Sequence, residues 1–505
     1  MRWRGRTGEW YGWVSHNNLV NPANSGKLEG LVGLNQGLGL DLVPGIRIGQ
    51  RKDFNASQSS TDLEPSVDVF YKLTSALTAA ITVNTDFSGT GADARQINLS
   101  RFGLFFPERR DFFLQDTDIF EFGRIGSAES NFNTTIGRVE RESGRPFFSR
   151  RIGLTDSGET IDLDIGGKLT GRIGRWDIGL LDIRQAGHAA ADSSNLFVGR
   201  AAARIFAESM LGLIVTDGDP ESDRGNTLVG LDFRYLNTRL ANGGAIEGAI
   251  WYQQTDTEGV DGDDAAFGVS FKMPNGQGFR GGIGFKELQA GFNPALGFVN
   301  RSGVRDYTLE FGHTWRPGND RIRLVYSGVD AQRIDRIEGA LQSQRINVRI
   351  VEFETSSSEK MDFRFTLARE QVVEPFEISE GIFIPPGLYV YDFYCIGSGT
   401  GPHRRLAADL WVCDGGFYSG DALGIFGGLI WRPSPHLSFD ARYSMNDVEL
   451  PQGDFITRLV SLRANVAFTS TWSWENFIQY DNVSDSLGLN SILRWVPRAG
   501  REMVL

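Results

Sequence analysis

The sequence predicts an all-β protein, a large antiparallel transmembrane β-barrel of about 22–26 strands with an inserted Phe-rich plug or loop segment. Three observations predict this class. Apolar and polar residues alternate with a period of two in many segments, and short turn-like links alternate with longer polar links. In addition, only 7 of the 51 basic residues are lysine, and the rest are arginine.

The alternation is clear in residues 307–315, where Tyr307, Leu309, Phe311, His313 and Trp315 occupy the odd positions and smaller or polar residues the even ones. The same pattern places Phe365 and Leu462 on the apolar faces of residues 361–368 and 460–468. Successive side chains of a strand point to opposite faces, so each segment has one apolar and one polar face. If the protein is a membrane barrel, we expect the apolar faces to contact lipid.

The links between segments alternate in length. Tight links are expected near 74, 173, 206, 240, 276, 318, 358, 400, 434, 470 and 499. Longer polar links are expected at 186–195, 217–225, 254–264, 287–303, 329–343, 370–386, 445–454 and 481–486. Short turns on one side and long loops on the other are typical of a meandering barrel, whose strands of about 10 residues cross a bilayer when tilted.

A soluble sheet is the competing interpretation, and the polar faces favour the barrel. Arginine has a planar fork that pairs with carboxylates across a lumen, whereas a surface in bulk water would be richer in lysine. Aromatic residues near strand ends, such as Trp251, Trp315 and Trp431, suit girdles at the membrane interfaces. The candidates for lumen side chains are Arg234, Arg321, Arg323, Arg345, Arg349, Arg364 and Arg463.

Composition excludes several other classes. A net charge of -12 argues against a nucleic-acid partner. No window is long and apolar enough for a membrane helix, and the N-terminus Met1–Gly8 shows no apolar signal sequence. The strand-like body nevertheless predicts an extracytoplasmic location, so we expect the start of the chain to be truncated or misassigned.

Residues 101–123 break the rhythm because they combine seven Phe with eight charged residues and contain Pro107, which cannot donate within a central strand. We therefore expect residues 107–145 to enter or cap the lumen. The predicted organisation is an N-terminal segment at 1–36 and a barrel at 37–505, with 107–145 as its inserted plug.

Several pieces of the sequence are similar to the domain-of-unknown-function family numbered 5916. They are residues 84–87, 92–102, 104–114, 146–154, 431–437 and 477–482. The resemblance implies a Gram-negative outer-membrane barrel, usually preceded by a signal peptide and by a domain similar to family 9 carbohydrate-binding modules. It also implies a further strand beyond Leu505, so we expect the chain to be truncated at both ends.

The resemblance brings no established substrate and no catalytic residue. It marks as motif or plug residues Asp86, Phe87, Arg101, Phe105, Phe106, Pro107, Glu108, Arg110, Phe112 and Phe113. The structural interpretation is a packed plug element, and the functional one is a platform on which sugars or apolar molecules stack.

Motifs for catalysis and cofactors are not found. The sequence has neither a Gly-x-Ser-x-Gly elbow nor a phosphate-binding loop, and its five histidines lack metal-ligand spacing. We expect no cofactor and lean against an enzyme. One acidic loop could hold calcium through oxygen ligands, although a solvated loop explains it as well: Asp256, Glu258, Asp261, Asp263 and Asp264.

The two cysteines are predicted to be unpaired. If residues 387–396 and 404–413 form a hairpin centred at 400, Cys395 and Cys413 lie about eight residues apart along the strands, on the order of 25 Å. A disulfide needs Cα atoms within about 7 Å.

The functional prediction is a barrel at the bacterial cell surface, in the outer membrane, that passes or handles a solute, with a carbohydrate-related solute as one candidate. One alternative is a membrane-bound hydrolase that acts on a glycan or other polymer in the lumen or loops. Another is a structural or docking barrel. The expected partners are outer-membrane lipid and a glycan or small solute.

Overall fold

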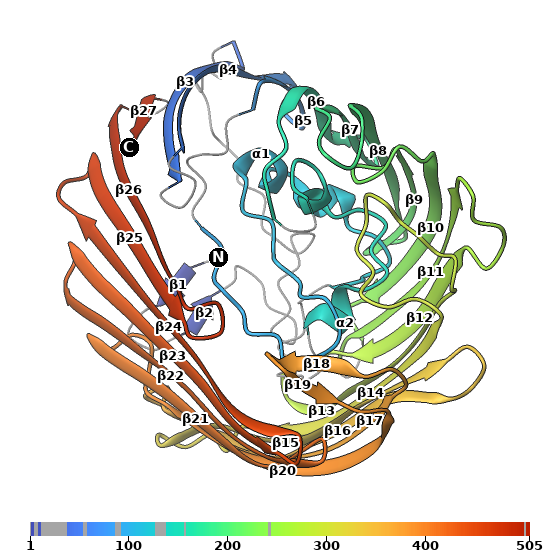
Figure 1. Cartoon of the computed structure of the whole chain (residues 1–505), viewed down its shortest axis with the longest axis vertical. Coiled ribbons are helices and arrows are strands. Elements are labelled where there is room, and N and C mark those ends of the chain that lie inside the picture. Colours follow the sequence, from blue (N-terminus) through green and yellow to red (C-terminus); the bar gives the residue numbers. More distant parts are fainter. Residues whose placement is uncertain are drawn as a thin grey trace.

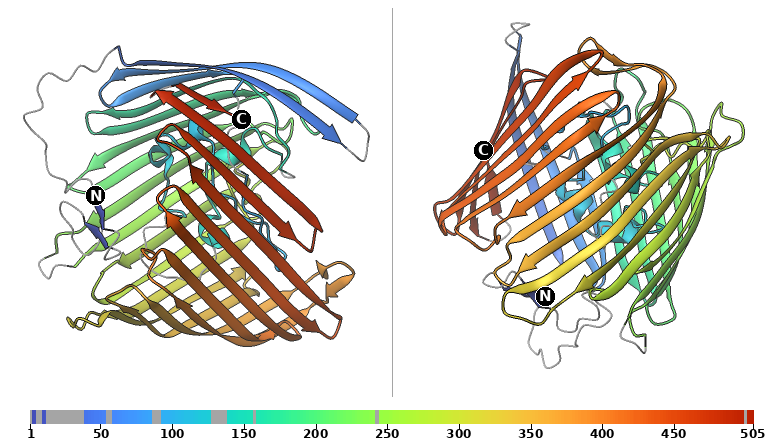
Figure 2. Two further views of the ribbon diagram at one scale, coloured as in Figure 1. Left: turned by 90° about the vertical axis from the view of Figure 1, so that its left-hand side faces the viewer. Right: turned by 90° about the horizontal axis from the view of Figure 1, so that it is seen from below.

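A computed structural model describes residues 2–4, 9–11, 38–53, 58–85, 92–126, 138–155, 158–240, 244–498 and 501–505. Within these ranges, 23 strands form one sheet whose order closes on itself, with β27 next to β3 and β9 next to β10. All neighbouring pairs from β3 round to β27 are antiparallel hairpin partners, apart from β5–β6 and β17–β20, which are joined by longer segments. Figure 1 looks into this ring, and Figure 2 shows the tilt of its strands. The predicted all-β barrel class and its strand number are confirmed.

The strands of the barrel, called the wall below, are β3 (Leu40–Asp53), β4 (Gln58–Thr74), β5 (Leu77–Val83), β6 (Leu163–Ile173), β7 (Trp176–Gln185), β8 (Ser194–Ile205), β9 (Ser209–Asp217), β10 (Asn226–Asn237), β11 (Ile246–Thr257), β12 (Ala265–Met273), β13 (Gly278–Leu288), β14 (Val304–Trp315), β15 (Ile322–Arg336), β16 (Leu341–Thr355), β17 (Lys360–Val372), β20 (Gly387–Gly399), β21 (Leu406–Phe417), β22 (Gly420–Ser434), β23 (Leu437–Leu450), β24 (Gly453–Ala467), β25 (Trp472–Asp481), β26 (Ser486–Arg498) and β27 (Arg501–Val504). Two short pairs lie outside this sheet: β1 (Arg2–Arg4) with β2 (Glu9–Tyr11), and β18 (Phe376–Ser379) with β19 (Ile382–Ile384).

The wall has an apolar outer face. Leu309 and Phe311 of β14 are about half exposed, whereas Asp306 and Thr314, on the opposite face of the same strand, are buried. Leu462 of β24 is also exposed, and Phe365 of β17 stacks on the exposed Tyr394 of β20 at 4.9 Å. The predicted alternation is therefore confirmed, and the apolar side chains point away from the interior rather than against a second sheet.

The two ends of the barrel differ. At the end formed by the short turns, Trp176, Trp315, Trp431 and Trp495 are exposed on the outer face, and Trp495 stacks on Trp472 at 5.3 Å. Long links gather at the opposite end, including the segment between β5 and β6 and the one between β13 and β14. Two links expected to be long are short, because β15 runs on to Arg336 and β23 to Leu450.

The segment between β5 and β6 is here called the insert, and its described residues lie inside the ring (Figure 1). Its short helices are α1 (Asp111–Leu114), η2 (Thr117–Phe120), α2 (Arg138–Glu142) and η3 (Ser149–Arg151). The buried Phe112, Phe113, Phe120 and Phe122 form one hydrophobic core with inward side chains of β6–β14. Burial of these rings stabilises the insert, because each aromatic side chain contributes hydrophobic free energy when it leaves water. A ring that stayed half-exposed in a polar lumen would contribute less.

The β18–β19 hairpin forms a second, smaller core. Ile378 and Ile384 pack with Tyr418, Val448 and Leu450 at the loop end of the wall. Burial raises the pKa of the Tyr418 phenol. Leu99 and other partly buried residues pack against this cluster, so the hairpin and the insert meet.

The prediction of unpaired cysteines is wrong. Cys395 of β20 and Cys413 of β21 are direct register partners and form a disulfide, with Cα atoms 4.1 Å apart. The turn between the two strands is centred near 404 rather than 400, because Gly399 pairs with Asp409. A shift of four residues in the centre of a hairpin moves every cross-strand partner by eight, which is the whole distance by which the prediction separated the sulfurs.

Trp251 also differs from the expectation. It is 6% exposed and points inward, where its indole meets the Phe122 ring at 6.3 Å.

Among the residues the structure covers, no helix is sufficiently long and apolar to span a membrane.

Candidate functional site

A buried ion pair fixes the middle of the insert. The Arg110 guanidinium donates to both carboxylate oxygens of Glu108, at 2.9 and 2.7 Å, and to the carbonyls of Ser149 and Ile152. The Ser149 hydroxyl donates to Glu108 at 2.7 Å. The guanidinium also lies 4.3 Å from the centre of the Phe113 ring. Two sequence pieces that carry the family resemblance, 104–114 and 146–154, therefore meet in one fully bonded cluster.

The charge state of this cluster follows from its bonds. Burial alone would raise the pKa of Glu108, but the hydrogen bonds and charge of Arg110, with the Ser149 hydroxyl, lower the pKa below its ordinary value. Glu108 is therefore ionised at neutral pH, and its ion pair with Arg110 connects residues 108–110 to residues 149–152 of the insert.

Residues 92–106, here called the strap, run through the interior between two separate parts of the wall, β25 and β17. Arg95 donates to Asp481 of β25 at 2.6 Å, and its backbone N–H donates to Gln479. Arg101 reaches the other side, where it donates to the Gln371 carbonyl of β17 at 2.9 Å. The strap thus ties β25 to β17 by polar contacts.

The remaining motif residues are mostly structural. Phe105 is buried and stacks on Phe148 at 4.8 Å, and Phe106 lies below the Arg150 guanidinium. Arg150 pairs with Asp93 at 2.6 Å. Pro107 is exposed, and Asp86 and Phe87 lie outside the described residues.

Six of the seven candidate lumen arginines lie on the inner face, and the structure gives five of those six a partner. Arg234 pairs with Glu247, Arg323 with Glu354, Arg349 with Glu352 and Asp362, and Arg364 with Asp362, while Arg463 covers the Phe477 ring. Arg345 shares the inner face with Ser343 and Asn347 but is exposed. Arg321 is the exception, because it lies in the turn that precedes β15 and is exposed to solvent there.

The five residues of the acidic loop are not gathered into one cluster. The described residues contain no group of three metal-binding side chains, and Asp256, Glu258, Asp261, Asp263 and Asp264 all fall within the described ranges. Two of them have other partners: Asp264 accepts a hydrogen bond from the side chain of Gln254, and Glu258 accepts one from the backbone of Gly225. The side chains spread along a strand end and an exposed turn, so their oxygens do not converge.

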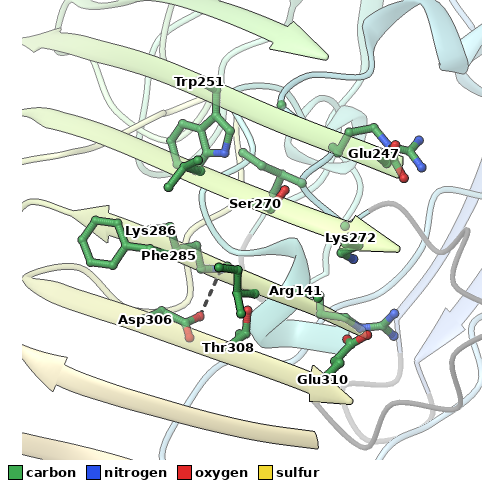
Figure 3. A pocket seen from close by; sticks show the side chains of 18 of the residues that line it. Arg141, Glu247, Trp251, Ser270, Lys272, Phe285, Lys286, Asp306, Thr308 and Glu310 are labelled. Carbon is green, nitrogen blue, oxygen red and sulfur yellow. Dashed lines mark ion pairs between the residues drawn. The ribbon is translucent and has the colours of Figure 1, made fainter. Parts of the chain in front are cut away.

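A cavity of about 150 Å³ lies between the insert and strands β11–β15 (Figure 3). Lys272, Lys286, Asp306 and Glu310 line it from the wall, and Arg141 lines it from α2. Sequence reasoning missed these residues. The only sequence signal is that three of the few lysines, Lys168, Lys272 and Lys286, lie at inward positions of the wall.

Two further cavities border the insert. One, of about 520 Å³, lies towards the turn end and is lined by Asp116, Arg172, Arg200 and Arg204, and it shares Gly123 and Arg124 with the cavity of Figure 3. The other, of about 830 Å³, lies at the loop end between the strap, the β18–β19 hairpin and the β25–β26 link. Cavities therefore border the insert at both ends of the barrel.

These features define a large antiparallel barrel whose interior holds a folded insert. Residues 38–170 match the family model described as Domain of unknown function (DUF5916), which confirms the family resemblance over β3–β5, the insert and most of β6. The chain is also similar to the crystal structure of the siderophore receptor PirA from Acinetobacter baumannii, with 7% identity and a TM-score of 0.43 over 88% of this chain and 76% of that one. No curated protein matches the chain.

Proposed function

We propose that the protein is a barrel of the bacterial outer membrane through which small solutes pass. The observation that carries the proposal is the contrast between the two faces of the wall. The outer face presents exposed Leu, Ile, Val and Phe side chains around the ring, whereas the inner face carries paired charges and amides. In water such an outer face would be a very large exposed apolar surface, which is unfavourable. In a membrane the same side chains contact lipid, so this surface is not exposed to water.

The dimensions agree with a membrane-spanning role. Most strands of the wall have 9 to 17 residues. Strands of about 9–11 residues, tilted as in Figure 2, are long enough to cross the hydrocarbon layer of a bilayer. The exposed tryptophans at the turn end suit the interface between lipid and headgroups.

The interior supports passage of solutes rather than a sealed core. On β23 and β24, several described side chains that face inward are polar and partly exposed: Asp440, Arg442, Ser444, Asn446 and Arg463. A relation to carbohydrate is supported only by the family resemblance and is part of the proposal. The possible solutes therefore include sugars.

Reconstitution into planar bilayers and liposomes tests the proposal. We expect a steady ionic current and swelling of liposomes in isotonic solutions of small sugars. A folded, detergent-stable barrel that gives neither current nor swelling would contradict passage and favour the docking alternative. Turnover of a glycan by the same preparation would favour the hydrolase.

A further inference from the structure

Three charged side chains around the cavity of Figure 3 lack the partners that such groups usually have. They are Lys272 of β12, Glu310 of β14 and Arg141 of α2. Within the part of the chain that the structure describes, none of the three makes a hydrogen bond or an ion pair within 4.0 Å. The Oε2 atom of Glu310 and the Nε atom of Arg141 are buried without any hydrogen-bond partner.

Two other lysines that point inward near the insert, Lys168 and Lys286, form hydrogen bonds to it. Lys168 donates to the carbonyls of Phe112 and Gln115 at the end of α1. Lys286 donates to the carbonyls of Glu140 and Ser143 at the end of α2, at 2.5 and 3.0 Å, and lies 3.5 Å from Asp306. Both lysines therefore attach the insert to the wall, whereas the Lys272 ammonium group makes no such hydrogen bond among the described residues.

Unpaired charges beside a cavity are costly unless something supplies their missing partners. In Figure 3, Arg141 and Glu310 point towards one another across the cavity, with Lys272 beside them. Ser270 and Thr308 line the same space, and no described residue hydrogen-bonds to either hydroxyl. The cavity thus combines two cations, one carboxylate and two hydroxyls whose side chains make no hydrogen bond and no ion pair within 4.0 Å to any described residue, although the charges of Lys272 and Arg141 act on Glu310 across the space. The other charged residues that line it are already paired, as in Lys286–Asp306 and Arg124–Glu247.

The charges and the volume define the chemistry of a ligand. Two cations suit a carboxylate, because charge-assisted N–H···O bonds are stronger than bonds between neutral groups. Glu310, when ionised, can only accept, so the same ligand needs a hydrogen-bond donor close to its carboxylate. A cavity of about 150 Å³ holds a molecule of roughly benzene size, which limits the ligand to about six or seven heavy atoms.

We infer that this cavity binds a small carboxylate that carries a neighbouring hydroxyl or ammonium group. The carboxylate lies on Lys272 and Arg141, and the donor lies on Glu310. Access runs along the insert, because the cavity shares Gly123 and Arg124 with the larger charged cavity that extends towards the turn end. The inference deepens the proposed function, on which it rests, by naming a class of solute.

Two isosteric probes separate the two donors. Glycerate carries hydroxyls and serine carries an ammonium group beside the carboxylate, while glycerol lacks the carboxylate. The barrel in lipid nanodiscs is titrated with each compound and followed by saturation-transfer NMR. We expect glycerate, serine or both to bind to the wild-type barrel and glycerol to show no saturable binding.

Matched variants then assign the contacts. Lys272→Gln should weaken carboxylate binding at least about tenfold, because one charge-assisted bond is lost. Arg345→Gln removes the same charge from a lumen position outside the cavity and should leave binding unchanged. Glu310→Gln should weaken serine more than glycerate, since an amide accepts from a hydroxyl but does not pair with an ammonium group. Heat stability in nanodiscs checks that each variant is folded.

The inference is overturned if neither carboxylate binds to the folded wild-type barrel, if glycerol binds equally well, or if Lys272→Gln changes nothing. If Glu310→Gln leaves the affinities for both carboxylates unchanged, the donor contact is wrong. These failures are distinct from failure of the proposed function. A barrel that binds glycerate but carries no current keeps the site and loses passage, and a conducting barrel that binds neither probe loses the site alone.

Discussion

Two regions of the wall differ in what covers their inner face. In β6–β10, the inward Leu181, Ile183, Leu196 and Leu228 are at most 1% exposed because the insert packs on them. In β23, the inward Asp440 and Arg442 keep 38% and 45% of their side chains exposed. We call the side of the wall around β6–β10 the packed half and the side around β23 and β24 the polar half. Both halves have the same apolar outer face.

The difference between the two regions explains in which strands the alternation of apolar and polar residues is clear in the sequence. Clean alternation is found in 307–315, 361–368, 437–444 and 460–468, where the inner face meets polar surroundings. In the packed half, apolar residues occur on both faces of a strand, as in Leu180 and Leu181 of β7, so the period-two signal weakens. Loss of alternation in a barrel strand is therefore a sequence signal that something apolar covers its inner face.

The largest expected difference between the halves concerns their ion pairs. Arg110→Met removes the partner of buried Glu108 and should lower the free energy of unfolding of the insert by about 3–5 kcal/mol. Arg442→Met in the polar half breaks half-exposed pairs with Asp409 and Asp440 and should cost about 0–1 kcal/mol. Hydrogen exchange of residues 107–125 and of β23 measures the two effects. Equal losses in the two variants would remove the distinction between the halves.

The outer face should respond alike in both halves. Leu462→Arg or Phe365→Arg places a charge on the apolar outer face near a strand centre and should destabilise the barrel by about 2–4 kcal/mol. Ser461→Arg, next to Leu462 but on the inner face, is the matched control and should cost much less. Urea unfolding in lipid vesicles measures both, and a tolerant Leu462→Arg would mean that this face does not meet lipid.

The disulfide joins β20 and β21, and neither strand contributes a described residue to the hydrophobic core that contains Phe112 and Phe113. Removing it with the double substitution Cys395→Ser and Cys413→Ser should lower the stability of the barrel by roughly 2–3 kcal/mol, since it closes a loop of 18 residues. A thiol assay on the denatured, unreduced protein should find no free thiol. Finding two free thiols would restore the hairpin centred at 400.

The smallest effect is expected at a turn outside both halves. Hydrogen bonds from Ser357, Thr355 and Arg404 lower the pKa of Glu359 to about 2. Because the folded pKa lies below the usual value of 4.5, these contacts are fully present above about pH 4.5 and are lost as the pH falls towards 2. Exchange of the amides of the 355–360 turn should rise over this window. In Glu359→Gln the same amides should show no such step.

The sequence predicted much of the fold because local alternation and link length determine which face of each strand is apolar and where hairpins turn. From Pro107 and the Phe-rich run it predicted an inserted segment at 107–145, whereas the segment between β5 and β6 is longer and includes the strap at 92–106. It could not predict the Cys395–Cys413 pairing, because a change of four residues in one turn decides the register. Nor could it bring Arg141, Lys272 and Glu310 together, since these residues come from three distant segments that meet only when the insert docks.

Thiol modification during current recording tests the central account most directly. The native cysteines are paired, so an added cysteine is the one reactive thiol. We predict that a charged methanethiosulfonate reagent reduces the current through Ser444→Cys in the polar half, and leaves Leu228→Cys in the packed half and Leu462→Cys on the outer face unchanged. A current that falls with Leu228→Cys or Leu462→Cys but not with Ser444→Cys would contradict the account.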